Sequence, residues 1–351
     1  MIKTAQRQQK IVKIIKGHPG IQSSEIERIL VDQEKIKIAR ITIIRDLEKL
    51  LSEKLIIKQG EGRNISYIID ASANFLMPIE VDKYFAEDPD KRNLAYKTFN
   101  FDIYKKLNNL FSDAEIKELN KINDNYSGRI AKLPPDISKK EIERLIIELS
   151  WKSSKIEGNT YSLIDTEILL KDNKEAKGHK KEEAIMLLNH KAALDYIFSS
   201  SKEPTKLTTT KITNIHSLLV KNLGVGQGIR KKPVGITGTA FKPLDNQHQI
   251  LEALEKAVNL INKAKYPLEK ALLANVLIAY IQPFEDGNKR TSRLLANALL
   301  LANGYCPLSF RSINEAEYKK AVILFYEQNN LAYFKQLLVE QYKFSVANYF
   351  R

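Results

Sequence analysis

Two apolar segments, 271–281 and 294–301, flank a short polar stretch that contains one proline and one glycine. Both apolar segments are rich in leucine and alanine, which are good helix formers. Pro283 ends the first helix because proline removes a backbone donor, and Gly287 permits the tight turn that follows. We expect the second helix to start near Asn288. The pattern therefore predicts two core helices joined by a short polar loop.

The polar residues of this loop suit a bound phosphate. A helix start carries free backbone N–H groups, so it attracts anions. Arg290 and Arg293 lie three residues apart and can project from one helix face. Asp286 precedes them and is well placed for a divalent cation that accompanies phosphates. The stretch therefore predicts a nucleotide-phosphate site.

The stretch 282–293 reads Gln-Pro-Phe-Glu-Asp-Gly-Asn-Lys-Arg-Thr-Ser-Arg. It closely resembles the signature of the Fic/Doc (Fido) family, His-Pro-Phe-x-Asp/Glu-Gly-Asn-Gly/Lys-Arg-x-x-Arg. The resemblance implies transfer of AMP from ATP to a Ser, Thr or Tyr hydroxyl of a protein (AMPylation), with Mg2+ bound by Asp286. It further implies that the ATP phosphates are bound by Gly287, Asn288, Lys289, Arg290 and Arg293.

Within that assignment, Asn288 and Arg290 would hold the α- and β-phosphates, and Arg293 the γ-phosphate. Lys289 is a permitted variant that also occurs in Doc toxins, which transfer the γ-phosphate instead. Those toxins lack the second arginine of the signature, and this chain has Arg293 there. We therefore expect AMP transfer to be the ancestral reaction.

Gln282 departs from the signature at the position of the catalytic base. The family has a histidine there, which accepts a proton near neutral pH, whereas an amide cannot act as a base. Losing a general base typically costs about 10²–10⁴ in rate. We therefore expect impaired or lost transfer, although Gln282 can still hydrogen-bond a hydroxyl. His216 lies on an apolar helix and is expected to be structural.

A second motif, Ser153 to Asn159, ends a helix that is predicted to start near Lys139. It resembles the inhibitory motif of many Fic proteins, Ser/Thr-x-x-x-Glu-Gly/Asn, with Ser153 and Glu157 at the defining positions. The resemblance implies that Glu157 pairs with Arg293 and blocks the γ-phosphate pocket. A carboxylate competes with phosphate for one guanidinium group, so the chemistry is sound. The alternative is an exposed carboxylate near a helix end.

Residues 228–243 hold a third match. The stretch 234–241 is rich in β-branched residues and suggests a short hairpin. It resembles the Fic flap, which holds a target segment extended through backbone hydrogen bonds. A purely structural hairpin is the alternative. The resemblance covers roughly residues 138–340, so we predict a Fic domain at 138–345, with its core at 204–339.

Residues 1–70 are predicted to form a separate unit of three helices followed by a two-stranded hairpin. Helix 38–54 is expected to bury Ile41, Ile44, Leu47, Leu50 and Leu51. This order resembles winged helix-turn-helix domains of bacterial regulators, which implies DNA binding through Thr42, Arg45, Lys49 and Arg63. The alternative is a protein-interaction or dimerisation domain of the same fold.

The remaining features fill in the organisation. Residues 71–137 are predicted to be a helical linker region, so the chain is mostly α with an α+β N-terminal unit. A net charge of +14 is compatible with nucleic acid or nucleotide as a partner. The single cysteine, Cys306, suits a reducing compartment, and no apolar stretch follows Met1, so we expect a cytoplasmic protein. The apolar segments are too short for a membrane span.

Two functions stay open. The first is a protein adenylyltransferase held off by Glu157, acting on itself or on a partner protein. The second is an ATP-sensing, DNA-binding regulator that has lost transfer. Gln282 favours the second, whereas the pairing expected between Glu157 and Arg293 favours the first. The sequence leaves a homodimer open.

Overall fold

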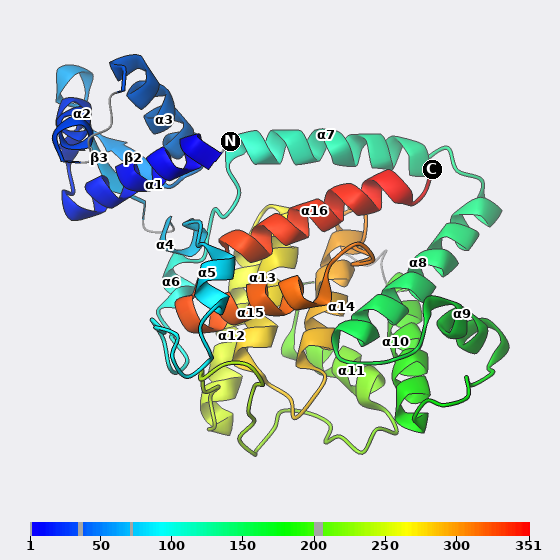
Figure 1. The fold of residues 1–351 in the computed structure, drawn as a ribbon. Helices are drawn as coiled ribbons and strands as arrows, with labels where there is room; N and C mark the ends of the chain where they lie inside the picture. Colours follow the sequence, from blue (N-terminus) through cyan, green and yellow to red (C-terminus); the bar gives the residue numbers. More distant parts are fainter. Residues whose placement is uncertain (1, 34–37, 71–72, 200–205) are drawn as a thin grey trace.

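The two predicted core helices lie at the centre of the larger part of the molecule (Figure 1). The computed structural model describes residues 2–33, 38–70, 73–199 and 206–351. Helix α13 (Pro267–Ile281) buries almost every side chain, and α14 (Asn288–Ala302) packs beside it. The loop between them runs from residue 282 to residue 287, as the positions of Pro283 and Gly287 indicated. These two helices therefore form the frame that carries the candidate site.

Further helices surround this pair, and most of them share one apolar core with it (Figure 1). They are α8 (Pro135–Ile156), α9 (Leu163–Asp172), α10 (Lys181–Ser199), α11 (Thr209–Val220), α12 (Gln247–Lys263), α15 (Glu315–Gln328) and α16 (Ala332–Asn348). Helix α8 starts at Pro135, which suits a first helical position because proline needs no donor there. The domain boundary predicted at 138 thus falls inside this helix.

The N-terminal unit contains the three helices and the hairpin expected from its sequence, together with a short strand, β1, that was not predicted. It contains α1 (Ile2–Gly17), β1 (Ile21–Gln22), α2 (Ser23–Asp32), α3 (Arg40–Ser52), β2 (Ile56–Gln59), η1 (Gly62–Asn64) and β3 (Ser66–Ile69). Strands β2 and β3 pair antiparallel, and β1 adds to the other edge of β3. The unit stands apart from the helical body in Figure 1.

The prediction for the buried face of α3 was partly wrong. Ile43, Leu47 and Leu50 are buried, whereas Ile41 and Ile44 are 56% and 36% exposed. The buried set follows i, i+4, i+7 spacing, and packing against α1 and α2 selects that stripe from an isoleucine-rich helix. Arg45 and Lys49 point to solvent as predicted, and the side chain of Arg63 lies outside the described residues.

Residues 73–130 are packed onto the body more closely than a linker would be. They form α4 (Ala73–Leu76), α5 (Val81–Phe85), α6 (Ile103–Lys106) and α7 (Asp113–Ile130), with a long irregular stretch between α5 and α6. Ile103, Phe111 and Leu119 are buried in the same apolar core as α13 and α14. The predicted helical linker is thus largely part of the body.

The predicted flap hairpin does not form. Among the described residues, 228–243 contain no β-ladder; the stretch is irregular, with a turn at 237–238. Its one bridge joins Lys242 to Thr98, in a parallel sense. Gly235, Thr237 and Gly238 are exposed, and the two glycines are poor strand formers. The β-branched residues Val234, Ile236 and Thr237 line one side of a pocket.

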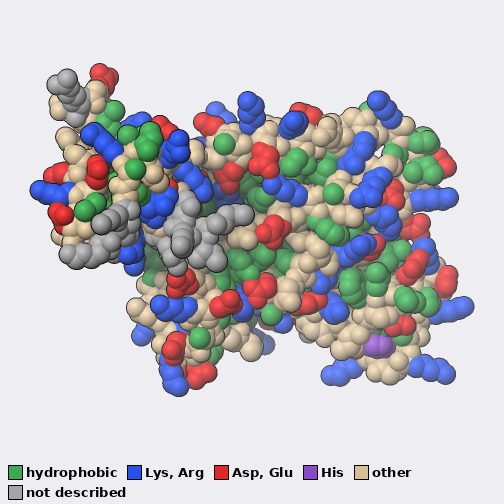
Figure 2. All heavy atoms as spheres, turned by 45° about the horizontal axis from the view of Figure 1, so that its top comes forward, with side chains coloured by type: hydrophobic (Ala, Val, Ile, Leu, Met, Phe, Trp, Pro, Cys, Tyr) green, Lys and Arg blue, Asp and Glu red, His purple; other side chains and the backbone are tan. Residues whose placement is uncertain are grey.

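Surface charge is dispersed over the face shown in Figure 2. Lysine and arginine side chains are scattered across both the N-terminal unit and the body, with acidic side chains between them. On this face the positive charge does not gather into one large patch. Within the described part of the chain, no helix combines the length and apolar character needed to cross a bilayer.

Candidate functional site

The loop between α13 and α14 turns through two left-handed residues. Gln282 follows the last residue of α13 at φ 51°, and Gly287 precedes α14 at φ 80°. A Cβ on Gly287 would lie 3.3 Å from a methyl carbon of Val220, which would have to shift slightly, and the left-handed conformation itself favours glycine. The left-handed Gln282 is unusual for a non-glycine residue, and such conformations cluster at functional sites.

The Gln282 side chain is buried, and both of its polar atoms are hydrogen-bonded. Its Nε2 donates to the Ala279 carbonyl at 2.6 Å and lies 3.4 Å from the Tyr326 hydroxyl, and its Oε1 accepts from Asn288 Nδ2 at 2.9 Å. Burial raises the pKa of Tyr326 well above its ordinary value, so this phenol stays protonated. Neither residue can therefore take a proton from a bound hydroxyl.

Asn288 closes the loop on itself. Its Oδ1 accepts from the Phe284 N–H at 2.9 Å, and its Nδ2 also donates to the Phe284 carbonyl at 2.8 Å. With the contact to Gln282, the amide is used within the loop. The backbone N–H of Asn288 lies in the first turn of α14, where backbone donors have no partner within the helix.

Asp286 and Arg290 form an ion pair at the start of α14. Arg290 Nη2 lies 2.9 Å from Asp286 Oδ2; the carboxylate is 65% exposed and the guanidinium 1%. His216 fixes the backbone beneath them, because its Nε2 lies 3.0 Å from the Asp286 carbonyl and its ring stacks on Phe284 at 3.6 Å. Burial, with a contribution from Arg290, lowers the pKa of His216 to about 4, so the ring is neutral.

A pocket of about 440 Å³ opens beside this loop. The volume lies within the range of small-ligand sites. The end of α8 and the loop into α14 supply most of its charged lining, namely Glu157, Glu285, Asp286, Lys289 and Arg290, and α15 adds Lys319. Its apolar lining comes from Val234 and Ile236 on the irregular wall and from Val322 and Ile323 on α15. The lining therefore suits an elongated ligand that has a charged group at one end and a flat apolar group at the other.

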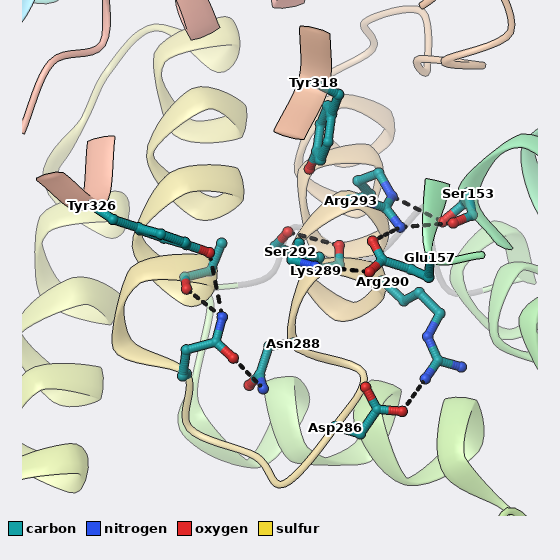
Figure 3. A network of polar contacts seen from close by, with 12 residues as sticks. Ser153, Glu157, Asp286, Asn288, Lys289, Arg290, Ser292, Arg293, Tyr318 and Tyr326 are labelled. Atoms are coloured by element: carbon teal, nitrogen blue, oxygen red, sulfur yellow. Dashed lines mark hydrogen bonds and ion pairs between the residues drawn. The ribbon is translucent and has the colours of Figure 1, made fainter. Parts of the chain in front are cut away.

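Glu157 closes the charged end of the pocket (Figure 3). It caps the C-terminal end of α8, and its carboxylate reaches two cations: Oε1 lies 2.9 Å from Arg293 Nη2, and Oε2 lies 2.9 Å from Lys289 Nζ. Burial alone would raise the pKa of Glu157, but Arg293 and Lys289 outweigh it and lower the pKa to about 2. The group is therefore a carboxylate at any physiological pH.

Arg293 is covered by this arrangement. Its Nε donates to Ser153 Oγ at 2.9 Å, its Nη2 donates to the Ser153 carbonyl at 2.8 Å, and the side chain has no exposed surface. The Tyr318 ring lies 5.1 Å from the guanidinium carbon. Ser153, Glu157 and Arg293 thus meet as predicted. Lys289, which is predicted to bind phosphate, forms an ion pair with Glu157 in this structure.

The fit of a divalent cation depends on Asp286. Within the described residues, no group of three or more His, Cys, Asp or Glu side chains could hold a metal alone. Mg2+ is commonly held by one or two carboxylates together with substrate phosphates. The exposed Asp286 carboxylate at the pocket lining fits that mode.

The sequence did not predict the contribution of α15. Lys319, Val322, Ile323 and Tyr326 follow i, i+3, i+4, i+7 spacing and line the pocket from one helix face. The spacing alone would not have selected them, because Tyr318, Ala321, Leu324 and Phe325 on the same helix are also apolar and buried. Only the packing of α15 over the loop separates the two sets.

Comparison with known proteins shows similarity to one family in the region that contains the α13–α14 loop. Residues 206–300 match the Fic/DOC family. The protein adenylyltransferase fic-1 of Caenorhabditis elegans is 28% identical over 169 residues, which is 46% of this chain and 33% of the relative. The protein adenylyltransferase Fic of Drosophila melanogaster is 28% identical over 171 residues, 48% of this chain and 35% of the relative. The chain thus spans about a third of the length of these curated relatives.

Solved structures share the fold. Fic-1 (residues 134–508) from C. elegans superposes with a TM-score of 0.55 at 21% identity, over 66% of this chain and 69% of that one. A Fic domain containing signaling protein from Bacteroides thetaiotaomicron gives 0.57 at 21% identity, over 66% of this chain and 94% of that one. The chain therefore contains a Fic/DOC family domain, and its helical body has the fold of Fic proteins.

Proposed function

We propose that this chain binds ATP with Mg2+ in the pocket and is a Fic-type protein adenylyltransferase restrained by Glu157 and impaired at Gln282. The observation that carries the proposal is the carboxylate of Glu157 placed on Arg293 and Lys289 at the charged end of the pocket. A carboxylate there occupies cations that suit a terminal phosphate. The names of the relatives support the reaction class.

The pocket residues have distinct parts in this account. The start of α14 and Arg290 hold the inner phosphates through backbone N–H groups and a guanidinium. Asp286 would hold Mg2+, which when bound neutralises phosphate charge. The nucleobase lies between Val234 or Ile236 and the α15 side chains Val322 and Ile323.

Transfer would need one more group than the pocket supplies. A target hydroxyl oxygen forms a bond to the α-phosphorus, pyrophosphate leaves, and the hydroxyl proton must go to an acceptor. Gln282 is an amide that already bonds Asn288 and Ala279, and Tyr326 is a protonated phenol. Within the described pocket lining no histidine replaces the base, since His216 is turned to the Asp286 carbonyl. We therefore expect slow transfer or none.

This deficit supports a second candidate function, an ATP-sensing DNA-binding regulator without transfer. The N-terminal unit has three helices and an antiparallel β2–β3 pair, and α3 exposes Arg45 and Lys49. The exposed Ile41 and Ile44 beside them would equally suit apolar contact with a protein or with a second copy.

The first candidate function, the adenylyltransferase, needs a different partner: a protein hydroxyl, on this chain or on another protein.

Calorimetric titration with ATP and Mg2+ tests the shared part of both candidates. Arg290→Ala should weaken ATP affinity about tenfold or more, because it removes charged hydrogen bonds to phosphate. The matched control is Arg311→Ala, which removes an arginine from a different groove. Equal affinity of the Arg290→Ala variant and the parent would place the phosphate site elsewhere and contradict the proposal.

A further inference from the structure

A buried ion pair beside the pocket joins two segments that are far apart in the chain. Arg92 lies in the irregular stretch between α5 and α6, and Glu327 lies in the last turn of α15. Arg92 Nη2 is 3.2 Å from Glu327 Oε1, and the two side chains are 2% and 0% exposed. Buried charges are costly unless they are paired and hydrogen-bonded. The pair therefore ties the 86–102 stretch firmly to α15.

The Glu327 carboxylate has two further partners. The Tyr84 hydroxyl donates to Oε2 at 2.6 Å, and the Thr239 hydroxyl donates to Oε1 at 2.5 Å. Burial and the bond to Glu327 raise the pKa of Tyr84, which keeps its proton available for donation. Residues from α5, from the irregular stretch and from the pocket wall thus converge on one carboxylate.

The contacts with Gly238 and Thr239 bear directly on the pocket. These residues follow immediately after 234–237, which form one wall of the pocket. Arg92 donates to the Gly238 carbonyl, and it reaches Thr239 through Glu327. A Cβ on Gly238 would lie 3.6 Å from Ile323 Cδ1, so this turn runs along the α15 face that lines the pocket. The ion pair therefore sets the separation between the wall and α15.

A second set of contacts fastens the far end of the wall to the same stretch. The Lys242 N–H donates to the Lys97 carbonyl at 2.9 Å, and the Tyr96 N–H donates to the Glu327 carbonyl at 3.0 Å. Between these points, Phe241 stacks on Tyr326 with ring centres 5.5 Å apart. Because the described part of the wall has no β-ladder of its own, these contacts take the place of hairpin pairing.

We propose that Arg92 is a positioning residue of the pocket, which with Glu327 holds the 234–237 wall against α15. The stretch 84–98 is then part of the binding site, although it lies outside the region that matches the Fic/DOC family. The effect on nucleotide binding rests on the proposed function, whereas the placement of the wall does not.

Hydrogen exchange of the full-length chain, followed by mass spectrometry, tests the placement. Arg92→Met should speed exchange of the 234–241 amides by about tenfold or more, because local opening becomes easier without the ion pair. Thr239→Val removes the hydroxyl that donates to Glu327 and that accepts from the Phe241 N–H, and at the amides other than Phe241 it should give a smaller rise, about threefold. Thr239→Ser keeps the hydroxyl and should restore exchange near the parent rate.

The chain offers a control in a second cluster of an arginine, a buried glutamate and a tyrosine, in which the arginine is 39% exposed. Arg311 Nη1 lies 3.0 Å from Glu148 Oε1, and the Tyr349 hydroxyl donates to the same carboxylate. Glu148 and Arg311 line a different groove. Arg311→Met should lower the melting temperature while leaving exchange of 234–241 within about twofold of the parent.

Unchanged exchange of 234–241 in both Arg92→Met and Thr239→Val would overturn the proposal and leave a merely stabilising pair. If Arg92→Met does not fold, the Thr239→Val and Thr239→Ser comparison decides. An ATP titration measures the effect on nucleotide binding. If the 234–237 wall is in place in only a third of the variant molecules, the apparent affinity for ATP should be about threefold weaker than that of the parent. If the parent binds no ATP, the proposed function fails, and the exchange experiment still decides the role of Arg92.

Discussion

Glu157 covers Arg293 at the inner end of the pocket, with a 2.9 Å contact between Oε1 and Nη2, and the guanidinium has no exposed surface. The second carboxylate oxygen reaches Lys289 at the same distance. One carboxylate therefore neutralises two cations that an incoming triphosphate would meet. The sequence predicted the contact of Glu157 with Arg293 but not the contact with Lys289. Lys289 is therefore a candidate restraint on Glu157 as well as a candidate phosphate ligand.

Lys289→Met tests whether Lys289 restrains Glu157 or binds phosphate, because the two roles predict opposite changes in the affinity for ATP relative to ADP. As a restraint, Lys289 holds the carboxylate in place, so its loss should raise ATP affinity relative to ADP by about two- to fivefold, the scale of a partly exposed ion pair. As a phosphate ligand, its loss should lower that ratio. Calorimetric titration with both nucleotides measures it.

The same substitution in a Glu157→Gln background gives the control. Without the carboxylate there is nothing for Lys289 to restrain, so the rise should vanish. A rise that persists in this background would mean that Lys289 acts on the nucleotide by another route. Lys319→Met, which removes a lysine that lines the same pocket from α15, reports the general effect of lost positive charge.

The stability of the chain should fall with acid through His216. Its pKa is lowered from 6.5 to about 4 in the folded protein, so the folded state disfavours the charged ring. The contribution is present above the unfolded-state pKa of 6.5 and is lost as the pH falls from there toward 4. The shift corresponds to roughly 3 kcal/mol across that window.

Urea unfolding of the parent and of His216→Gln between pH 7.5 and 4.5 measures this loss. Glutamine can donate to the Asp286 carbonyl and does not titrate, so the variant should show a shallower decline in unfolding free energy. Parallel pH profiles for the two proteins would show that His216 is not the responsible group.

DNA binding by the N-terminal unit makes a salt-dependent prediction for the full chain. If lysines and arginines neutralise phosphates, affinity for duplex DNA should fall steeply as salt rises. Arg45→Ala should weaken specific binding more than non-specific binding if Arg45 reads bases, and both equally if it contacts phosphate. Lys117→Ala, on α7, controls for loss of one exposed charge. No binding at low salt would leave the exposed Ile41 and Ile44 as a protein-interaction surface.

The sequence predicted the parts of this site that depend on local chemistry. Pro283 and Gly287 mark the ends of α13 and α14 because their backbone restrictions act within a few residues. The fixed spacing between Ser153 and Glu157 likewise places both on one turn at the end of α8. These predictions needed no knowledge of how distant segments pack.

The parts that were missed depend on packing between distant segments. The buried stripe of α3 was misjudged because Ile41, Ile43 and Ile44 are equally apolar, and only contacts with α1 and α2 choose among them. Arg92 carried no local signal, since its role comes from a glutamate far along the chain. The expected flap hairpin failed for the same reason: its anchors are on the 84–98 stretch.

The most direct test of the restrained adenylyltransferase is the intact mass of the chain after incubation with ATP and Mg2+. Restoring the base with Gln282→His should by itself give little modification, because Glu157 still occupies Arg293. Combining it with Glu157→Gly should give self-AMPylation at least about tenfold faster than Gln282→His alone, because Arg293 is then free to form charged hydrogen bonds with the terminal phosphate. Glu157→Gly alone, which lacks a base, should stay unmodified. The account predicts a mass gain of one AMP in the double variant; a double variant that gains no more than Gln282→His alone would contradict it.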